Sequence, residues 1–257
     1  LYTKRAKNWY FGDSAGIEFS CIIPSALTDG VTERVFPTNP SEGTTVISDI
    51  NGNLLFYAEG KHVFNKNHQM MPNGTALKST RSTLQGPLAF PVPKSDSLYY
   101  LFNVDAGPSG GGSGRGLTYS IIDMSLDNGL GDIIIGTLNT TLITGTEERL
   151  TAVKHCNGID YWVIVHENGN FHSFLASATG VTGPITSTSV ISASGEFGGQ
   201  LKASPTGKHL AMTTQIGQTP LPLIQSIFSS FVFDFDCSTG IVCNPLVLSL
   251  DTGVSSY

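Results

Sequence analysis

The chain has 257 residues, a formal net charge of -6 and only 13% charged residues. This sparse, acidic charge argues against a nucleic-acid partner, because such a partner requires a basic surface. No apolar run approaches the roughly eighteen residues that a transmembrane helix needs, so no membrane-spanning segment is expected. The 29 glycines and 13 prolines are typical of an all-β protein with many turns.

The clearest strands lie in the middle of the chain. Leu150–His155, Tyr161–His166 and Phe171–Ala176 are apolar runs of strand length. The first turn between them contains Asn157-Gly158 and the second Asn168-Gly169. Asn-Gly indicates a tight hairpin, because both residues tolerate a positive φ. Three strands cannot bury both faces of a sheet alone, so this meander needs neighbours of the same kind.

Similar units of strand, polar turn and apolar strand recur about every 40 to 65 residues, which is the spacing of β-propeller blades. The sequence therefore predicts an all-β fold, a β-propeller of four-stranded antiparallel blades within one domain, 1–257. The predicted blades are residues 44–80, 82–138, 148–192 and 198–250. Residues 1–43 are expected to form N-terminal strands and a loop, and the glycine-rich stretch 107–116 a loop excursion.

The end of the chain, residues 251–257, reads as the start of a further blade. Since a propeller closes by pairing its first and last blades, we expect the chain to be the N-terminal part of a larger propeller. Trp9 and Trp162 are expected in the packing between blades. Residues 216–227 are expected to form an apolar loop or a helical turn, and Val190-Ile191 an outer strand.

Four cysteines are present. Cys237 and Cys243 flank a short turn, which makes them a candidate disulfide pair across a hairpin. Cys21 and Cys156 are either a second pair or two buried thiols. No cysteine or histidine spacing matches a zinc site.

Few polar residues suggest chemistry. His166 and Glu167 are neighbours on a strand and point to opposite faces, and Glu147-Glu148 is expected to be a solvated edge before a strand. Asp234 and Asp236 face one side of a strand, which makes them a candidate Ca²⁺ site, with backbone amides or water as the alternative contacts. We predict no catalytic residue, no metal-binding residue and no cofactor beyond that Ca²⁺.

A set of motifs in fixed order resembles a known family. The motifs include Asn8-Trp9-Tyr10-Phe11-Gly12, the stretch from Ser48 to Tyr57, the stretch from Phe64 to Gly74, the stretch from Tyr161 to Glu167, and Ser204-Pro205-Thr206-Gly207-Lys208. They resemble the N-terminal β-propeller modules of large secreted or cell-surface proteins of Bacteroidota, which are adhesin-like or involved in gliding motility. The resemblance covers nearly the whole chain.

This resemblance implies export by the type nine secretion system, with the secretion machinery as a partner, and an extracellular or outer-surface location. It also implies O-glycosylation where Asp-Ser precedes a small or aliphatic residue. Ser14, in Asp13-Ser14-Ala15, and Ser97, in Asp96-Ser97-Leu98, match that pattern.

Three functions follow as hypotheses. The first is a non-enzymatic, adhesin-like surface module that binds a protein or a glycan. The second is a carbohydrate-active propeller enzyme, and the third is a structural spacer or secretion partner. Carboxylates gathered at the mouth of the central channel would favour the enzyme, an aromatic rim would favour glycan binding, and a broad apolar patch would favour a protein partner.

Overall fold

The computed structural model describes residues 4–12, 14–19, 23–31, 42–80, 82–106, 116–189, 199–218 and 226–251. Almost all regular structure in these ranges is β-strand. The helical segments are single 3₁₀ turns: η1 (Lys4–Ala6), η3 (Asp127–Gly129) and η4 (Ile135–Thr137). Within the described ranges, no helix has the length and apolarity needed to cross a membrane.

The strands form five antiparallel sheets. The first sheet contains β1 (Asn8–Gly12), β2 (Ala15–Glu18) and β3 (Ser25–Leu27). The second contains β4 (Thr44–Ser48), β5 (Leu54–Glu59) and β6 (Val63–Asn65). The third contains β7 (Pro87–Pro91), β8 (Leu98–Val104), β9 (Leu117–Asp123), β10 (Asp132–Ile133) and β11 (Thr140–Ile143). The fourth contains β12 (Leu150–Lys154), β13 (Tyr161–Glu167), β14 (Asn170–Ser177) and β15 (Gly180–Thr188). The fifth contains β16 (Leu201–Ala203), β17 (His209–Gln218), β18 (Ser226–Asp236) and β19 (Ile241–Asp251).

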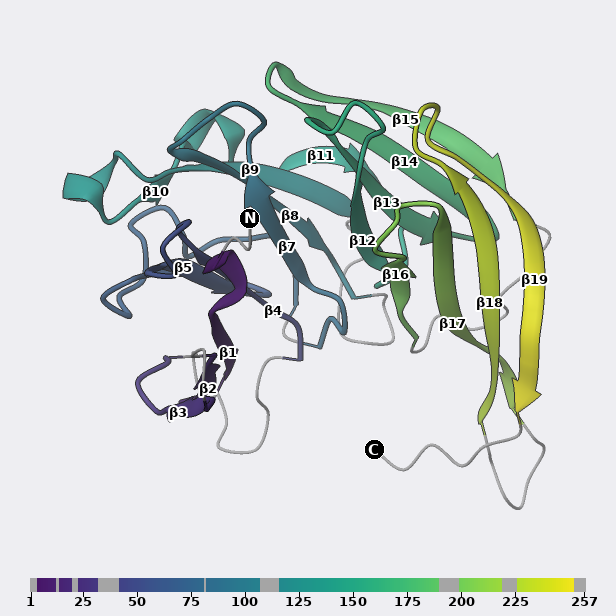
Figure 1. The fold of residues 1–257 in the computed structure, drawn as a ribbon, viewed down its shortest axis with the longest axis horizontal. Coiled ribbons are helices and arrows are strands. Elements are labelled where there is room, and N and C mark those ends of the chain that lie inside the picture. Colours follow the sequence, from purple (N-terminus) through teal and green to yellow (C-terminus); the bar gives the residue numbers. More distant parts are fainter. Residues whose placement is uncertain are drawn as a thin grey trace.

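The sheets are arranged like blades in an open arc, as Figure 1 shows. The first strands of the last four sheets, which we call the inner strands, lie side by side: β4 beside β7, β7 beside β12, and β12 beside β16. The predicted all-β, antiparallel, propeller-like fold is therefore confirmed. The described sheets do not close into a ring, and membership of a larger propeller stays a prediction.

In two of the four predicted blades, the number of described strands differs from the expected four. The sheet that begins with β4 has three strands, because residues 66–80 add only turns and an isolated bridge between Phe64 and Met70. The sheet that begins with β7 has five, because both β10 and β11 pair with β9. The sheets that begin with β12 and β16 have the predicted four strands.

The predicted central meander is confirmed as β12, β13 and β14. Asn168 and Gly169 have φ angles of 45° and 78°, as a type I′ hairpin requires. The fourth strand of this sheet is β15 (Gly180–Thr188), whereas the stretch predicted to supply it, Val190-Ile191, lies outside the described residues. The predicted loop at 216–227 is also wrong at both ends, because β17 continues to Gln218 and β18 starts at Ser226.

Apolar side chains fill the spaces between successive sheets. On β8, Leu101 packs with Phe56 toward the sheet of β4, while Phe102 packs with Val163 toward the sheet of β12. Burial on both faces explains why the strand reads as a continuous apolar run rather than an alternating one. Trp162 is buried, as expected, but Trp9 is 46% exposed because it lies on the face of β1 opposite to Tyr10, which packs inward.

The predicted Cys237–Cys243 disulfide is wrong. Cys237 bonds Cys156, with 5.2 Å between the Cα atoms, and Cys243 is a free, exposed thiol. The strand register explains the difference, because Cys243 lies opposite Asp234 on β18 while Cys237 lies beyond the end of that strand. The pairing of Cys156 also excludes a bond from Cys156 to Cys21, which lies outside the described residues.

We predict that C156S destabilises the protein by about 2–4 kcal/mol, because the disulfide closes a long loop in the unfolded chain. The separation of the two cysteines is 81 residues. Chemical denaturation measures the change, and C243S is the matched control, expected to leave stability unchanged. A peptide map without reductant that links Cys237 to Cys243 would contradict the assignment.

Candidate functional site

The inner strands begin at one common end of the molecule. Gly43 precedes β4 and Gly86 precedes β7, and a Cβ atom on Gly43 would lie 2.5 Å from the Gly86 nitrogen and 2.7 Å from the Thr83 carbonyl oxygen. Real Cβ atoms do not approach backbone so closely, so this contact requires glycine. The contact places Glu42, the residue before Gly43, beside segment 83–86.

The side chain of Gln85 connects the start of β7 to the start of β16. Its Nε2 donates to the Leu201 carbonyl oxygen at 3.0 Å, and its Oε1 accepts from the Leu201 N–H at 2.6 Å. Because the amide serves both backbone groups of Leu201, it acts as a one-residue extension of the ladder. The start of β7 is thereby fixed to the start of β16.

Glu148 reaches the same segment from the start of β12. Its Oε2 accepts a hydrogen bond from the Leu84 N–H at 2.9 Å. Burial is the main cause that raises the pKa of Glu148, and the charges of Glu42 and Asp105 raise it further, against the lowering effect of the Leu84 bond. Partial burial also raises the pKa of Glu42. Glu148 therefore lies near two other carboxylates, the exposed Glu42 and the fully buried Asp105, and we call these three residues the acidic mouth.

The neighbours of Glu148 in sequence point the other way, into the space between sheets. Glu147 forms an ion pair with Arg149, and its carboxylate lies 2.9 Å from Nδ1 of His166. Arg149 also donates from Nε to the Thr213 carbonyl oxygen at 3.2 Å and from its terminal nitrogen to the Thr214 hydroxyl. Glu147 and Arg149 thus anchor the backbone on both sides of Glu148.

Burial determines the charge states of Arg149 and His166. Burial lowers the pKa of Arg149 to about 10, so the guanidinium stays charged at neutral pH. Burial, helped by the charge of Arg149, lowers the pKa of His166 to about 3. His166 is therefore neutral, and its Nδ1–H donates to the Glu147 carboxylate.

The prediction that Glu147-Glu148 is a solvated edge is wrong. Both side chains are only partly exposed, and each has a defined partner. A signal for this site is present in the sequence when the blades are aligned on their inner strands. The second residue before each inner strand is Glu42, Gln85, Glu148 or Gly199, so two carboxylates and one amide share one structural position.

The other sequence-predicted residues lie elsewhere. Ser14 is exposed in the turn between β1 and β2, and Ser97 is half-buried in the turn before β8. O-glycosylation at both serines stays a prediction. His166 and Glu167 point apart, as expected, since His166 contacts Glu147 and Glu167 lies 3.4 Å from His172.

Asp234 and Asp236 are occupied by local donors. Asp234 accepts from Asn244 at 2.8 Å and lies 3.1 Å from His209. Asp236 accepts from the Ser238 hydroxyl at 2.6 Å, and this bond is the main cause that lowers its pKa to about 2. Within the described ranges, no group of three or more His, Cys, Asp or Glu residues has the arrangement of a metal site.

Comparison with known proteins assigns no family to this chain. No family model and no curated protein matches the chain. One solved structure that matches is that of a "putative 6-phosphogluconolactonase" from Bacteroides fragilis, at 15% identity and a TM-score of 0.46. The match covers 94% of this chain and 65% of the solved one, so the chain spans less than two thirds of that protein.

This finding contradicts the predicted non-enzymatic, adhesin-like module that binds a protein or a glycan, because the matching protein carries the name of an enzyme. We therefore withdraw the adhesin prediction. At this identity and TM-score the match assigns no activity to this chain. The resemblance to secreted propeller modules of Bacteroidota stays a prediction.

We predict that G43A lowers stability by about 1–3 kcal/mol, since the new methyl group overpacks a close backbone contact. The contact is the one with Gly86 and Thr83. Thermal and chemical denaturation measure the effect. G136A is the matched control, because a Cβ atom on Gly136 meets nothing within 4 Å. Equal stability of the two variants would show that β4 and β7 do not meet as described.

We predict that E148Q gains stability relative to the wild type as the pH rises. A carboxyl whose pKa is raised by folding holds more protons in the folded than in the unfolded state, so its ionisation removes stability as the pH rises through the folded pKa. Glutamine carries no charge and its Oε1 can still accept from Leu84. Denaturation of both proteins near pH 4 and near pH 8 tests this, and a gain of the same size at both pH values would contradict it.

Proposed function

We propose that this chain supplies the acid–base site of a propeller-like enzyme that cleaves glycosidic bonds, with its substrate at the acidic mouth. The observation that carries the proposal is the raised pKa of the partly buried Glu148 beside the carboxylates of Glu42 and Asp105. Carboxyl groups whose pKa values are shifted by burial and by neighbouring charges are typical of acid–base sites.

The chemistry needs one protonated and one ionised carboxyl group on either side of the scissile bond. Glu148 is the proposed acid, because its burial and its acidic neighbours favour the protonated form. It donates its proton to the glycosidic oxygen as the bond from that oxygen to the anomeric carbon breaks. Glu42, which is more exposed, is the proposed base that takes a proton from the attacking water. The products are two free sugars, and a proton exchange with solvent resets both carboxyl groups.

The surrounding contacts suit such a role. The Leu84 N–H holds one oxygen of Glu148 at 2.9 Å, which leaves the other oxygen for the substrate. Glu147 already pairs with the adjacent cation of Arg149, so that cation does not hold Glu148 in its ionised form. A proton donor is thereby fixed in place without losing its raised pKa.

The test is hydrolysis by the purified chain of a panel of p-nitrophenyl glycosides and of soluble polysaccharides. On the polysaccharides, we expect E148Q and E42Q each to lower kcat by at least about 100-fold, the usual contribution of a positioned acid or base. E18Q is the matched control, since Glu18 lies on β2 in an ion pair with Lys7. For E148Q, the loss should be much smaller on the p-nitrophenyl glycosides, because p-nitrophenolate leaves without needing a proton.

Two results would overturn the proposal. The first is a wild-type protein that hydrolyses no member of the panel. The second is an E148Q variant that retains the wild-type rate while E18Q behaves in the same way.

We also propose that the protein works outside the cytoplasm. The Cys156–Cys237 disulfide supports an oxidising compartment, since disulfides rarely persist where thiols are kept reduced. Export by the type nine secretion system, with its machinery as a partner, belongs to this proposal and rests on the resemblance described above.

A further inference from the structure

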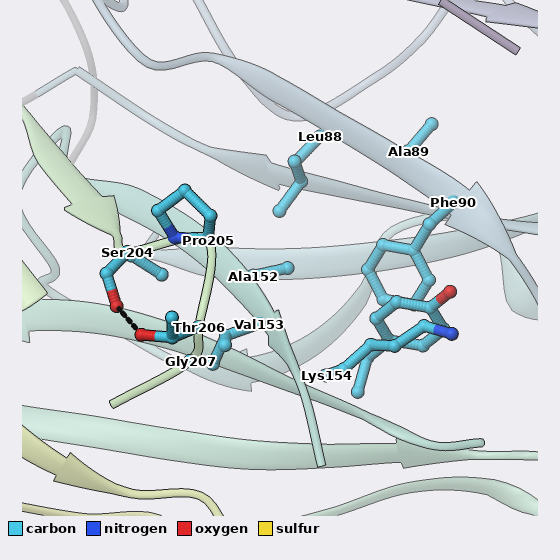
Figure 2. Close-up of a pocket in the computed structure, with 12 residues that line it drawn as sticks. Leu88, Ala89, Phe90, Ala152, Val153, Lys154, Ser204, Pro205, Thr206 and Gly207 are labelled. Atoms are coloured by element: carbon cyan, nitrogen blue, oxygen red, sulfur yellow. Dashed lines mark hydrogen bonds between the residues drawn. The ribbon is translucent and has the colours of Figure 1, made fainter. Parts of the chain in front are cut away.

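A pocket of about 440 Å³ lies at the opposite end of the inner strands from the acidic mouth. It is formed by residues 88–90 of β7 and 152–154 of β12, by Tyr161 at the start of β13, by the end of β16, and by the turn that follows β16. Figure 2 shows Phe90 and Lys154 on one side, the turn with Ser204, Pro205 and Thr206 on the other, and Ala152 between them. A pocket of this volume is in the range of small-molecule sites.

Small side chains create the space. Each of the three inner strands contributes an alanine to the lining: Ala89 from β7, Ala152 from β12 and Ala203 from β16. All three are partly exposed and lie at the border of the clusters between the sheets. Ala152 and Ala203 pack toward the neighbouring sheets that border the pocket, so a larger residue at either position would narrow it.

One wall of the pocket is aromatic. The rings of Phe90 and Tyr161 lie 4.6 Å apart between centroids, with 32° between their planes. Leu88 and the three alanines extend this apolar lining. Such a surface favours a flat apolar group, because aromatic rings stack on it at offset geometry.

The charge that lines the pocket is positive and belongs to Lys154. Among the described residues that line it, Lys154 is the only one with a charged side chain. Its Nζ donates to the Gly158 carbonyl oxygen at 3.2 Å and lies 5.8 Å from the centroid of the Tyr161 ring. Both partners are neutral, and no carboxylate pairs with Lys154 in the part of the chain that the structure describes. On the facing turn, the hydroxyls of Ser204 and Thr206 lie 3.2 Å apart.

We propose that this pocket binds a small aromatic carboxylate, with its ring against Tyr161, which the mostly buried Phe90 supports from behind, and its carboxylate on Lys154. Lys154, which has no carboxylate partner among the described residues, favours a ligand with a negative charge. The aromatic and alanine lining favours a ligand with a flat apolar ring. The Ser204–Thr206 hydroxyl pair supplies polar contacts at the far side for a ring substituent.

The site is distinct from the acidic mouth and does not rest on the glycosidase proposal. Glu148 precedes β12 and Lys154 ends it. Because a strand rises about 3.3 Å per residue, the two side chains mark opposite ends of the inner strands. Loss of one activity therefore leaves the other unchanged.

The experiment is calorimetric titration of the purified full chain with 2-naphthoate, and with 2-naphthamide as the neutral isostere. We expect 2-naphthoate to bind, and K154M to raise its Kd about 5-fold, the loss of one partly exposed ion pair. K154M should leave the affinity for 2-naphthamide unchanged. K202M is the matched control, since Lys202 is exposed on β16 and does not line the pocket.

A second variant tests the location. A152L fills the pocket from within and should abolish binding of both probes, while A211L, at an exposed alanine of β17, should not. Circular dichroism and the unfolding midpoint confirm that each variant is folded. The proposal is overturned if the wild type binds neither probe up to about 5 mM, which is weaker than −4 kcal/mol. It is also overturned if A152L binds as well as A211L, or if K154M and K202M weaken 2-naphthoate equally.

Discussion

The close approach of the inner strands is the constraint on which the rest of the structure depends. β4, β7, β12 and β16 belong to four different sheets, so no backbone ladder joins them, yet they lie side by side. Little room is therefore left for side chains between these strands. Glycines precede β4 and β7, alanines lie in the middle of β7 and β12 and at the end of β16, and larger side chains pack between the sheets.

The same constraint explains why the polar groups gather at the two ends. Between the sheets both faces of most strands are buried, so a polar group there needs a partner. Gln85 and Arg149 solve this by satisfying backbone groups of a neighbouring strand. Glu147 also has buried partners, Arg149 and His166. Glu148 lies at the start of β12 instead, where partial burial raises its pKa. A charge held there costs stability, which is typical of functional rather than structural groups.

Much of the fold could be predicted from the sequence, because hairpin signals act over a few residues. Asn168-Gly169 and the apolar runs around it specify β13 and β14 whatever surrounds them. The site could not be predicted in this way, since Glu148 meets Leu84 across 64 residues of chain. The Glu147-Glu148 pair has the composition of a solvated edge, and only the approach of a neighbouring sheet buries it. The disulfide pairing could not be predicted for the same reason, since Cys156 and Cys237 follow strands of different sheets.

The two ends of the inner strands differ in charge, and this difference separates what each can bind. Glu42, Asp105 and Glu148 make the starting end acidic, which disfavours an anionic ligand and suits a neutral one such as an uncharged sugar. Lys154 is the one charged group lining the pocket at the other end, which suits an anion. We therefore expect an anion to bind the alanine-lined pocket rather than the mouth. Because both ends are built on the same strands, a residue that widens or narrows the gap between β7 and β12 is expected to affect both, whereas Glu148 and Lys154 act independently.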